Sequence, residues 1–122
     1  MYIRFQGRKK NERADSNLGI FQMAFGLRDS EKLEKHFEKE LIENIEWLKM
    51  HLKSPQELNE EEHFRAISWF HPRAKEPIKR VRRIKTILEE HGYIIDTLKT
   101  DDPGIIIYED GWQVIAKPRK NT

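Results

Sequence analysis

The sequence contains no cysteine and no long apolar run. Without cysteine the chain has no disulfide, no thiolate nucleophile and no cysteine-ligated zinc. No run of aliphatic residues is longer than Ile105–Ile107, far short of the roughly 20 apolar residues that a membrane-spanning helix needs. These absences predict a cytoplasmic protein that makes no contact with a membrane.

Catalytic and metal-binding motifs are missing as well. The chain has no glycine-rich phosphate loop, no His-Glu-x-x-His motif and no recognisable Ser-His-Asp arrangement. Its histidines do not stand at metal-ligand spacing, so we expect no metal and no cofactor. Carboxylates near the C-terminus are candidates for acid–base work, but they occur in Asp-Pro-Gly and Asp-Gly sequences that turns favour. An enzyme is therefore the less favoured interpretation.

Charge is what the chain has in excess. Charged residues make up 36% of the 122 residues, against about 25% in a typical domain, and hydrophobic residues make up 37%. Three tryptophans and six phenylalanines can nevertheless supply a core. We expect one compact domain over residues 1–122, with a modest core and a strongly ionic surface.

The charges alternate in blocks along the chain, although the net charge is only +2. Residues 28–63 carry six bases and eleven acids, whereas residues 64–88 carry eight bases and one acid. Such blocks are solvated faces, complementary surfaces within one molecule, or a footprint for a charged partner.

The hydrophobic periodicity predicts an α+β fold, with two or three helices packed on a mainly antiparallel sheet. Helices are expected over residues 18–27, 29–52 and 77–91, with a strand as the alternative for the first. Strands are expected over residues 2–5, 64–70, 93–99 and 103–109, and residues 6–17 are expected to form a mobile loop.

The dipeptide Asp110-Gly111 predicts a two-residue hairpin turn. In that register Ile107 faces Val114 and Glu109 faces Trp112. The last strands would then form a C-terminal β meander or hairpin, joined to the strand over residues 64–70.

A basic cluster marks the beginning of the helix predicted after Pro77, where the helix dipole disfavours cations. Its members are Arg73, Lys75, Lys79, Arg80, Arg82 and Arg83. We expect them to face negative groups, as the contact surface of a small binding or regulatory module. One hypothesis is a protein partner or a homo-oligomer, with opposite charge blocks steering the encounter. The alternative is a polyanion such as RNA or DNA, whose phosphates would meet helix amides and guanidinium groups.

Trp47 and Met50 suggest a second contact. Trp47 falls off the main apolar stripe of the long helix, and Met50 lies nearby on the same side. Aromatic residues and methionine are enriched at protein interfaces. The alternative interpretation is that the helix over residues 18–27 packs over both side chains.

The second half of the chain resembles a group of small bacterial proteins of unknown function. The resemblance rests on "ISWF", "IKRVRRIKTILEEHG" and "PGIIIYEDGWQVIAKP", and it covers roughly residues 64–118. It implies a stand-alone domain, and no activity or catalytic residue follows from it.

Overall fold

The computed structural model describes residues 1–11, 16–53 and 66–119. These residues form an α+β fold with three helices, which confirms the predicted class. The elements in chain order are β1 (Tyr2–Asn11), β2 (Ser16–Gly19), α1 (Ile20–Arg28), α2 (Lys35–His51), β3 (Ile67–Phe70), α3 (Lys75–Glu90), β4 (Ile95–Thr100), β5 (Ile105–Glu109) and β6 (Gln113–Lys117). Within the described ranges, no helix is both long enough and apolar enough to cross a membrane.

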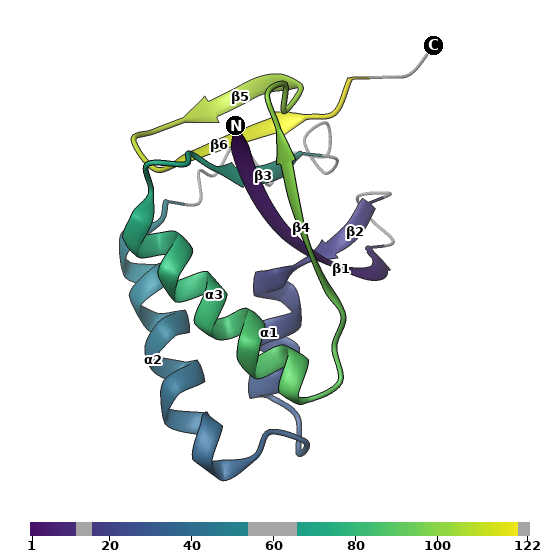
Figure 1. Ribbon diagram of the computed structural model, residues 1–122, viewed down its shortest axis with the longest axis vertical. Helices are drawn as coiled ribbons and strands as arrows, with labels where there is room; N and C mark the ends of the chain where they lie inside the picture. The colour runs from purple at the N-terminus through teal and green to yellow at the C-terminus, as the bar shows by residue number, and fades with distance from the viewer. Residues whose placement is uncertain (12–15, 54–65, 120–122) are drawn as a thin grey trace.

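The strands form one sheet in which every pair is antiparallel (Figure 1). The order is β2-β1-β3-β6-β5, and β4 pairs with β1. The long strand β1 connects the parts of the sheet. It pairs with β4 over residues 2–7, and it meets β3 at Ile3 and β2 from Gln6 onward.

Arg4 fills the fork where β1 changes its partner from β3 to β2. Its Nη1 donates to the carbonyl oxygen of Ser68 at 3.1 Å, and its Nε donates to Oε1 of Gln6 at 2.9 Å. Burial of the side chain lowers the pKa of the Arg4 guanidinium to about 10. The bond to Ser68 gives a backbone carbonyl at the fork a hydrogen-bond partner. An unpaired buried carbonyl there would be costly.

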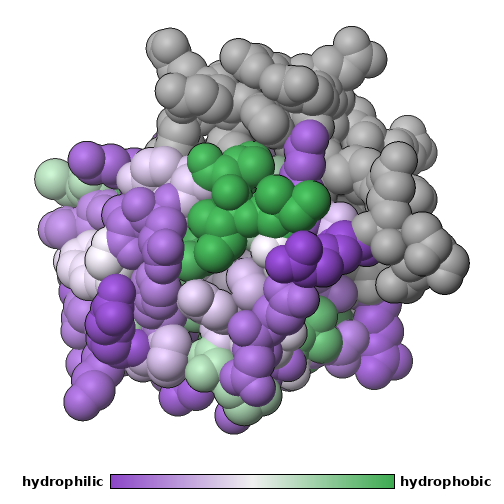
Figure 2. Space-filling view, turned by 90° about the horizontal axis from the view of Figure 1, so that it is seen from above, coloured by the Kyte–Doolittle hydropathy of each residue, from purple (hydrophilic) through white to green (hydrophobic). Residues whose placement is uncertain are grey.

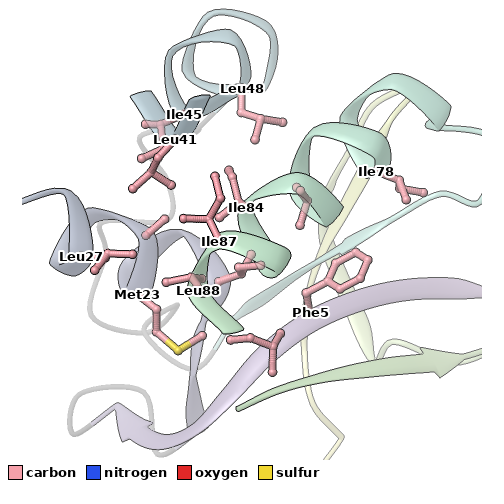
Figure 3. Packing of buried hydrophobic residues seen from close by; sticks show 14 of the residues in the cluster. Phe5, Met23, Leu27, Leu41, Ile45, Leu48, Ile78, Ile84, Ile87 and Leu88 are labelled. Carbon is pink, nitrogen blue, oxygen red and sulfur yellow. The ribbon is translucent and has the colours of Figure 1, made fainter. Parts of the chain in front are cut away.

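The helices cover one face of the sheet. α1 contacts β1, α3 contacts β4, and α2 packs chiefly on α1 and α3. In Figure 3, Leu41, Ile45 and Leu48 of α2 point toward α3, while Phe5 of β1 approaches α3 from the sheet side. Each large aliphatic side chain that is fully buried contributes about 1.5–3 kcal/mol of gross stabilisation.

The C-terminal strands form a hairpin and not a meander. β5 pairs with β6 as predicted, but β4 pairs with β1, so its partner lies some 90 residues earlier in the chain. Pattern and turn chemistry identify strands and tight turns, whereas the partner of β4 is set by a non-local contact. The prediction that β4 pairs with β5, as a meander requires, is therefore wrong.

The hairpin register also differs from the prediction. Glu109 lies opposite Val114, so the turn centres on Gly111 and Trp112. Oδ1 of Asp110 accepts from the backbone N–H of Trp112 at 2.9 Å and from that of Gln113 at 3.0 Å. The aspartate side chain thus closes the turn, and Gly111 does not take the positive φ of the expected turn.

Several helices and strands begin or end at other residues than predicted. β1 extends to Asn11 and β2 covers residues 16–19, so most of the predicted mobile loop is strand, and residues 12–15 lie outside the described residues. The strand predicted over 64–70 is β3 from Ile67 onward, and residues 64 and 65 also lie outside the described part. α2 begins at Lys35 and not at residue 29, and Nε2 of His91 accepts from the backbone N–H of Glu34 at its N-cap.

Candidate binding surface along helix α3

Helix α3 sorts its basic residues onto two faces. With 3.6 residues per turn, Lys75, Lys79 and Arg82 share one stripe, and Arg80 and Arg83 lie on a neighbouring stripe. The buried residues of the helix are Pro77, Ile78, Val81, Ile84, Ile87 and Leu88. The basic cluster of the sequence is therefore two groups on the helix, with Arg73 in the turn before it.

Arg80 and Arg83 are matched by groups of the same chain. Arg83 pairs with Glu40 of α2, with its Nε 2.7 Å from Oε1. Arg80 donates from Nε to Oε1 of Glu76 at 2.9 Å, and its guanidinium carbon lies 5.0 Å from the ring centroid of Trp47. Exposed ion pairs are worth about 0–1 kcal/mol each. Their main consequence here is that these two cations already have partners.

Arg73 anchors the beginning of α3 to the β5–β6 hairpin. Its Nε donates to the carbonyl oxygen of Gly111 at 3.1 Å. Beside it, the backbone N–H of His71 donates to the carbonyl oxygen of Trp112 at 2.9 Å. Arg73 thus positions the helix and does not line the stripe of Lys75, Lys79 and Arg82.

The stripe of Lys75, Lys79 and Arg82 lines a groove of about 310 Å³, which we call the α3 groove. The other lining residues are Ile3, Pro72 and Ile78, so the groove combines an apolar wall with three cations. Among the described residues, none of the three cations forms an ion pair with a carboxylate. The volume is at the lower end of the range for small-ligand sites.

A fourth cation, Lys99, does not line the α3 groove but pairs in the sheet with Ile3, which does. Lys99 of β4 lies directly opposite Ile3 of β1, and opposed residues of an antiparallel pair point to the same face of a sheet. Because Ile3 lines the groove and packs against the helical core, Lys99 stands on that helix-covered face at the sheet edge. Sequence reasoning missed this residue because the pairing of β4 with β1 is non-local.

Trp47 and Met50 occupy different environments. The Trp47 ring stacks on His51 with centroids 4.0 Å apart and on Trp112 with centroids 5.9 Å apart, and it is partly buried against the core. Met50 is 81% exposed, so α1 does not cover it. A role of Trp47 and Met50 in an interface stays a prediction.

The C-terminal carboxylates that we considered for acid–base work serve turns and ion pairs. Asp102 accepts from Nε of Arg119 at 3.0 Å and from the backbone N–H of Gly104 at 3.1 Å. These bonds, chiefly the one from Arg119, hold the pKa of the Asp102 carboxyl below its ordinary value. Within the described ranges, no group of three or more His, Asp or Glu side chains is placed to hold a metal.

One histidine does meet a carboxylate. Nε2 of the buried His71 lies 3.0 Å from Oε2 of Glu109, although the angle is not that of a hydrogen bond. The Tyr2 ring packs against the imidazole with centroids 5.3 Å apart. The pair connects the end of β3 to the hairpin, and it becomes an ion pair when His71 is protonated.

No family model, curated protein or solved structure matches this chain. The resemblance of residues 64–118 to small bacterial proteins therefore stays a prediction.

Proposed function

We propose that this protein is a binding module that holds an acidic, partly apolar segment of a partner protein in the α3 groove. The observation that carries the proposal is the division of the basic cluster. Arg80 and Arg83 have partners within the chain, whereas Lys75, Lys79 and Arg82 line a groove with apolar walls and have no carboxylate partner among the described residues.

The spacing of the three cations suits a peptide. At a rise of 1.5 Å per residue, Lys75 and Arg82 stand roughly 10 Å apart along α3. That length corresponds to about three residues of an extended chain. Carboxylates at the ends of such a segment would meet Lys75 and Arg82, and an apolar side chain between them would pack on Ile3 and Ile78.

The cations of α3 lie near its N-terminus, where the helix dipole is also positive. The positive charge of both favours an anionic partner in the groove. Glu76, the acid of the first turn, is already paired with Arg80 and does not neutralise the groove. Lys99 adds positive charge from the sheet side. These fields would speed association with an acidic segment and make it sensitive to salt.

An acidic protein segment fits this surface better than a nucleic acid does. Strongly salt-dependent DNA binding is typical of proteins that make about 6–10 phosphate contacts, whereas three cations line the α3 groove. Its apolar wall of Ile3, Pro72 and Ile78 has no role in phosphate binding. A protein segment would use both the cations and the wall.

The test compares two charge-reversed variants of the full chain. Lys79→Glu with Arg82→Glu reverses the groove, and Lys35→Glu with Lys39→Glu makes the same charge change on exposed positions of α2. The probes are a fluorescein-labelled peptide of alternating glutamate and leucine, a single-stranded RNA and a duplex DNA. Fluorescence anisotropy is recorded at about 20 mM salt, where screening is weak.

We expect the peptide to bind the wild type, to bind the groove variant at least tenfold more weakly, and to bind the α2 variant with nearly unchanged affinity. Backbone amide shifts in a titration followed by NMR should centre on residues 75–82 and Ile3. Peptide binding that is absent in the wild type, or equal in both variants, would contradict the proposal. Tighter binding of RNA or DNA with the same dependence on the groove would assign the surface to nucleic acid.

A further inference from the structure

A second pocket, which we call the α1–α2 pocket, lies between the helices α1 and α2 and the sheet. Its volume is about 380 Å³, which is within the range of small-ligand sites. Its apolar lining consists of Phe21 and Phe25 of α1, Leu48 and Leu52 at the end of α2, and Ile115 of β6. It shares no lining residue with the α3 groove, so it is a separate site.

The charged residues that line the α1–α2 pocket are both lysines, Lys49 and Lys53. Nζ of Lys49 lies 5.9 Å from the ring centroid of Phe25, which places the ammonium group beside an aromatic ring of the pocket wall. Within the part of the chain that the structure describes, neither lysine forms an ion pair with a carboxylate. An apolar pocket with two such cations suits a ligand that joins an apolar body to an acidic group.

A buried cation next to the pocket adds to the positive charge. Ser68 of β3 lines the pocket, and its carbonyl oxygen accepts from Nη1 of Arg4 at 3.1 Å. Arg4 is only 9% exposed, and it has no carboxylate partner among the described residues. A buried charge without a counter-ion is costly, and an anion in the pocket would offset part of that cost. The surroundings therefore favour an acidic ligand over a neutral or cationic one.

The volume of the pocket limits the size of the ligand. One water molecule in the liquid occupies about 30 Å³, close to the volume of a methylene group, so a pocket of about 380 Å³ holds roughly twelve groups of that size. A medium-chain fatty acid anion such as octanoate fits within that limit. A long-chain lipid exceeds it.

We propose that the α1–α2 pocket binds a small carboxylate with an apolar body, of the size of a medium-chain fatty acid anion. The apolar chain packs between the phenylalanines of α1 and the leucines of α2, and burial of that chain supplies the larger part of the affinity. The carboxylate accepts charge-assisted hydrogen bonds from Lys49 and Lys53. Because the pocket and the α3 groove have no residue in common, the two sites bind their ligands independently.

The first test compares three probes with the same apolar chain: octanoate, octanol and octyltrimethylammonium. Each is titrated into the full chain below the concentration at which it forms micelles, at about 20 mM salt, where screening is weak. Binding is followed by backbone amide shifts in NMR spectra. We expect octanoate to shift residues 21–25 and 48–53, octanol to bind there at least fivefold more weakly, and the cation not to bind there.

The second test removes the lysines. Lys49→Ala with Lys53→Ala takes both cations from the pocket, and Lys35→Ala with Lys39→Ala makes the same charge change on exposed positions of the same helix. Octanoate should bind the pocket variant at least fivefold more weakly and the control variant as it binds the wild type. Octanol should bind all three proteins alike. Circular dichroism of each variant establishes that the fold is retained.

The exposed isoleucines of β5 report unspecific apolar binding. Ile105 is 55% exposed and Ile106 is 45% exposed at the edge of the sheet. Figure 2 shows an apolar patch on the end of the molecule where β5 and β6 lie in Figure 1. Octanoate shifts that centre on this patch and not on α1 and α2 would overturn the proposal.

Three other results would overturn it as well: no binding of octanoate to the wild type, equal affinities for octanoate and octanol, or octanoate binding that does not depend on Lys49 and Lys53. The groove variant Lys79→Glu with Arg82→Glu should bind octanoate as the wild type does. This result separates the outcome for the pocket from that of the peptide experiment on the α3 groove.

Discussion

Replacement of Gly104 by alanine should be the most damaging of the glycine substitutions. Gly104 precedes β5 and has φ of +114°, which L side chains rarely adopt. An alanine Cβ there would stand 2.1 Å from the carbonyl oxygen of Lys117 and 3.1 Å from Cα of Pro118. Both obstacles are backbone atoms, so neither can rotate away as a flexible side chain would.

The expected cost has two parts. A non-glycine residue in a sparsely populated backbone region costs about 1–3 kcal/mol. Relief of the contact with Lys117 must also move the end of β6 away from β5, where Ile105 pairs with Lys117, at the loss of one or two backbone hydrogen bonds of about 1 kcal/mol each. We therefore expect Gly104→Ala to lower the free energy of unfolding by about 2–5 kcal/mol, a large share of the 5–15 kcal/mol typical of a domain.

Gly92→Ala provides the matched control. Gly92 also has a positive φ, +89°, but a Cβ there meets no atom within 4 Å. Its cost should be the backbone strain alone, about 1–2 kcal/mol. The assay is urea unfolding of wild type and both variants at 25 °C, followed by tryptophan fluorescence. If Gly104→Ala costs no more than Gly92→Ala at unchanged m-value, the steric argument at Lys117 is wrong.

Two further predictions concern polar contacts. In a double-mutant cycle of Arg83→Ala and Glu40→Ala, urea unfolding should give a coupling of about 0.2–1 kcal/mol that shrinks at 1 M salt; a coupling near zero at low salt would show that the ion pair does not hold α3 to α2. At Asp110, burial raises the pKa, but hydrogen bonds, first from the Trp112 N–H, outweigh burial and leave the pKa below its ordinary value. A lowered carboxyl pKa adds stability at neutral pH that is lost as the pH falls through the folded-state pKa. Asp110→Asn should therefore be about 1 kcal/mol less stable than the wild type at pH 7. This difference in the free energy of unfolding should narrow toward pH 3. A difference in urea unfolding that stays constant with pH would contradict this.

Much of the fold follows from local patterns. The apolar periodicity of residues 77–91 predicts α3 to within two residues of its observed start, because helix hydrogen bonds join residues close in the sequence. The polar composition of residues 6–17, in contrast, predicts a loop, and this prediction is wrong for most of the segment. Gln6 and Gly7 pair with β4 far along the chain, whereas the rest of the strand in this segment comes from the local pairing of β1 with β2, which polar composition does not reveal.

The candidate site shows the same division. The sequence identifies the basic cluster and predicts that it faces negative groups, and Arg83 with Glu40 is one such contact. It does not show that α2 occupies one side of the cluster while Lys75, Lys79 and Arg82 border a groove, because that depends on which face of α3 each neighbouring element covers. Nor does it show that Lys99 lies opposite Ile3 in the sheet.

The sequence by itself determined the class of fold, the amphipathic helices, the strand pair around the last turn and the presence of a basic surface, since each rests on spacing within one segment. The tertiary structure decided the partner of β4, the separation of paired from groove-lining cations and the exposure of Ile105 and Ile106 at a sheet edge. These depend on contacts between distant segments, whose free energies no single segment records.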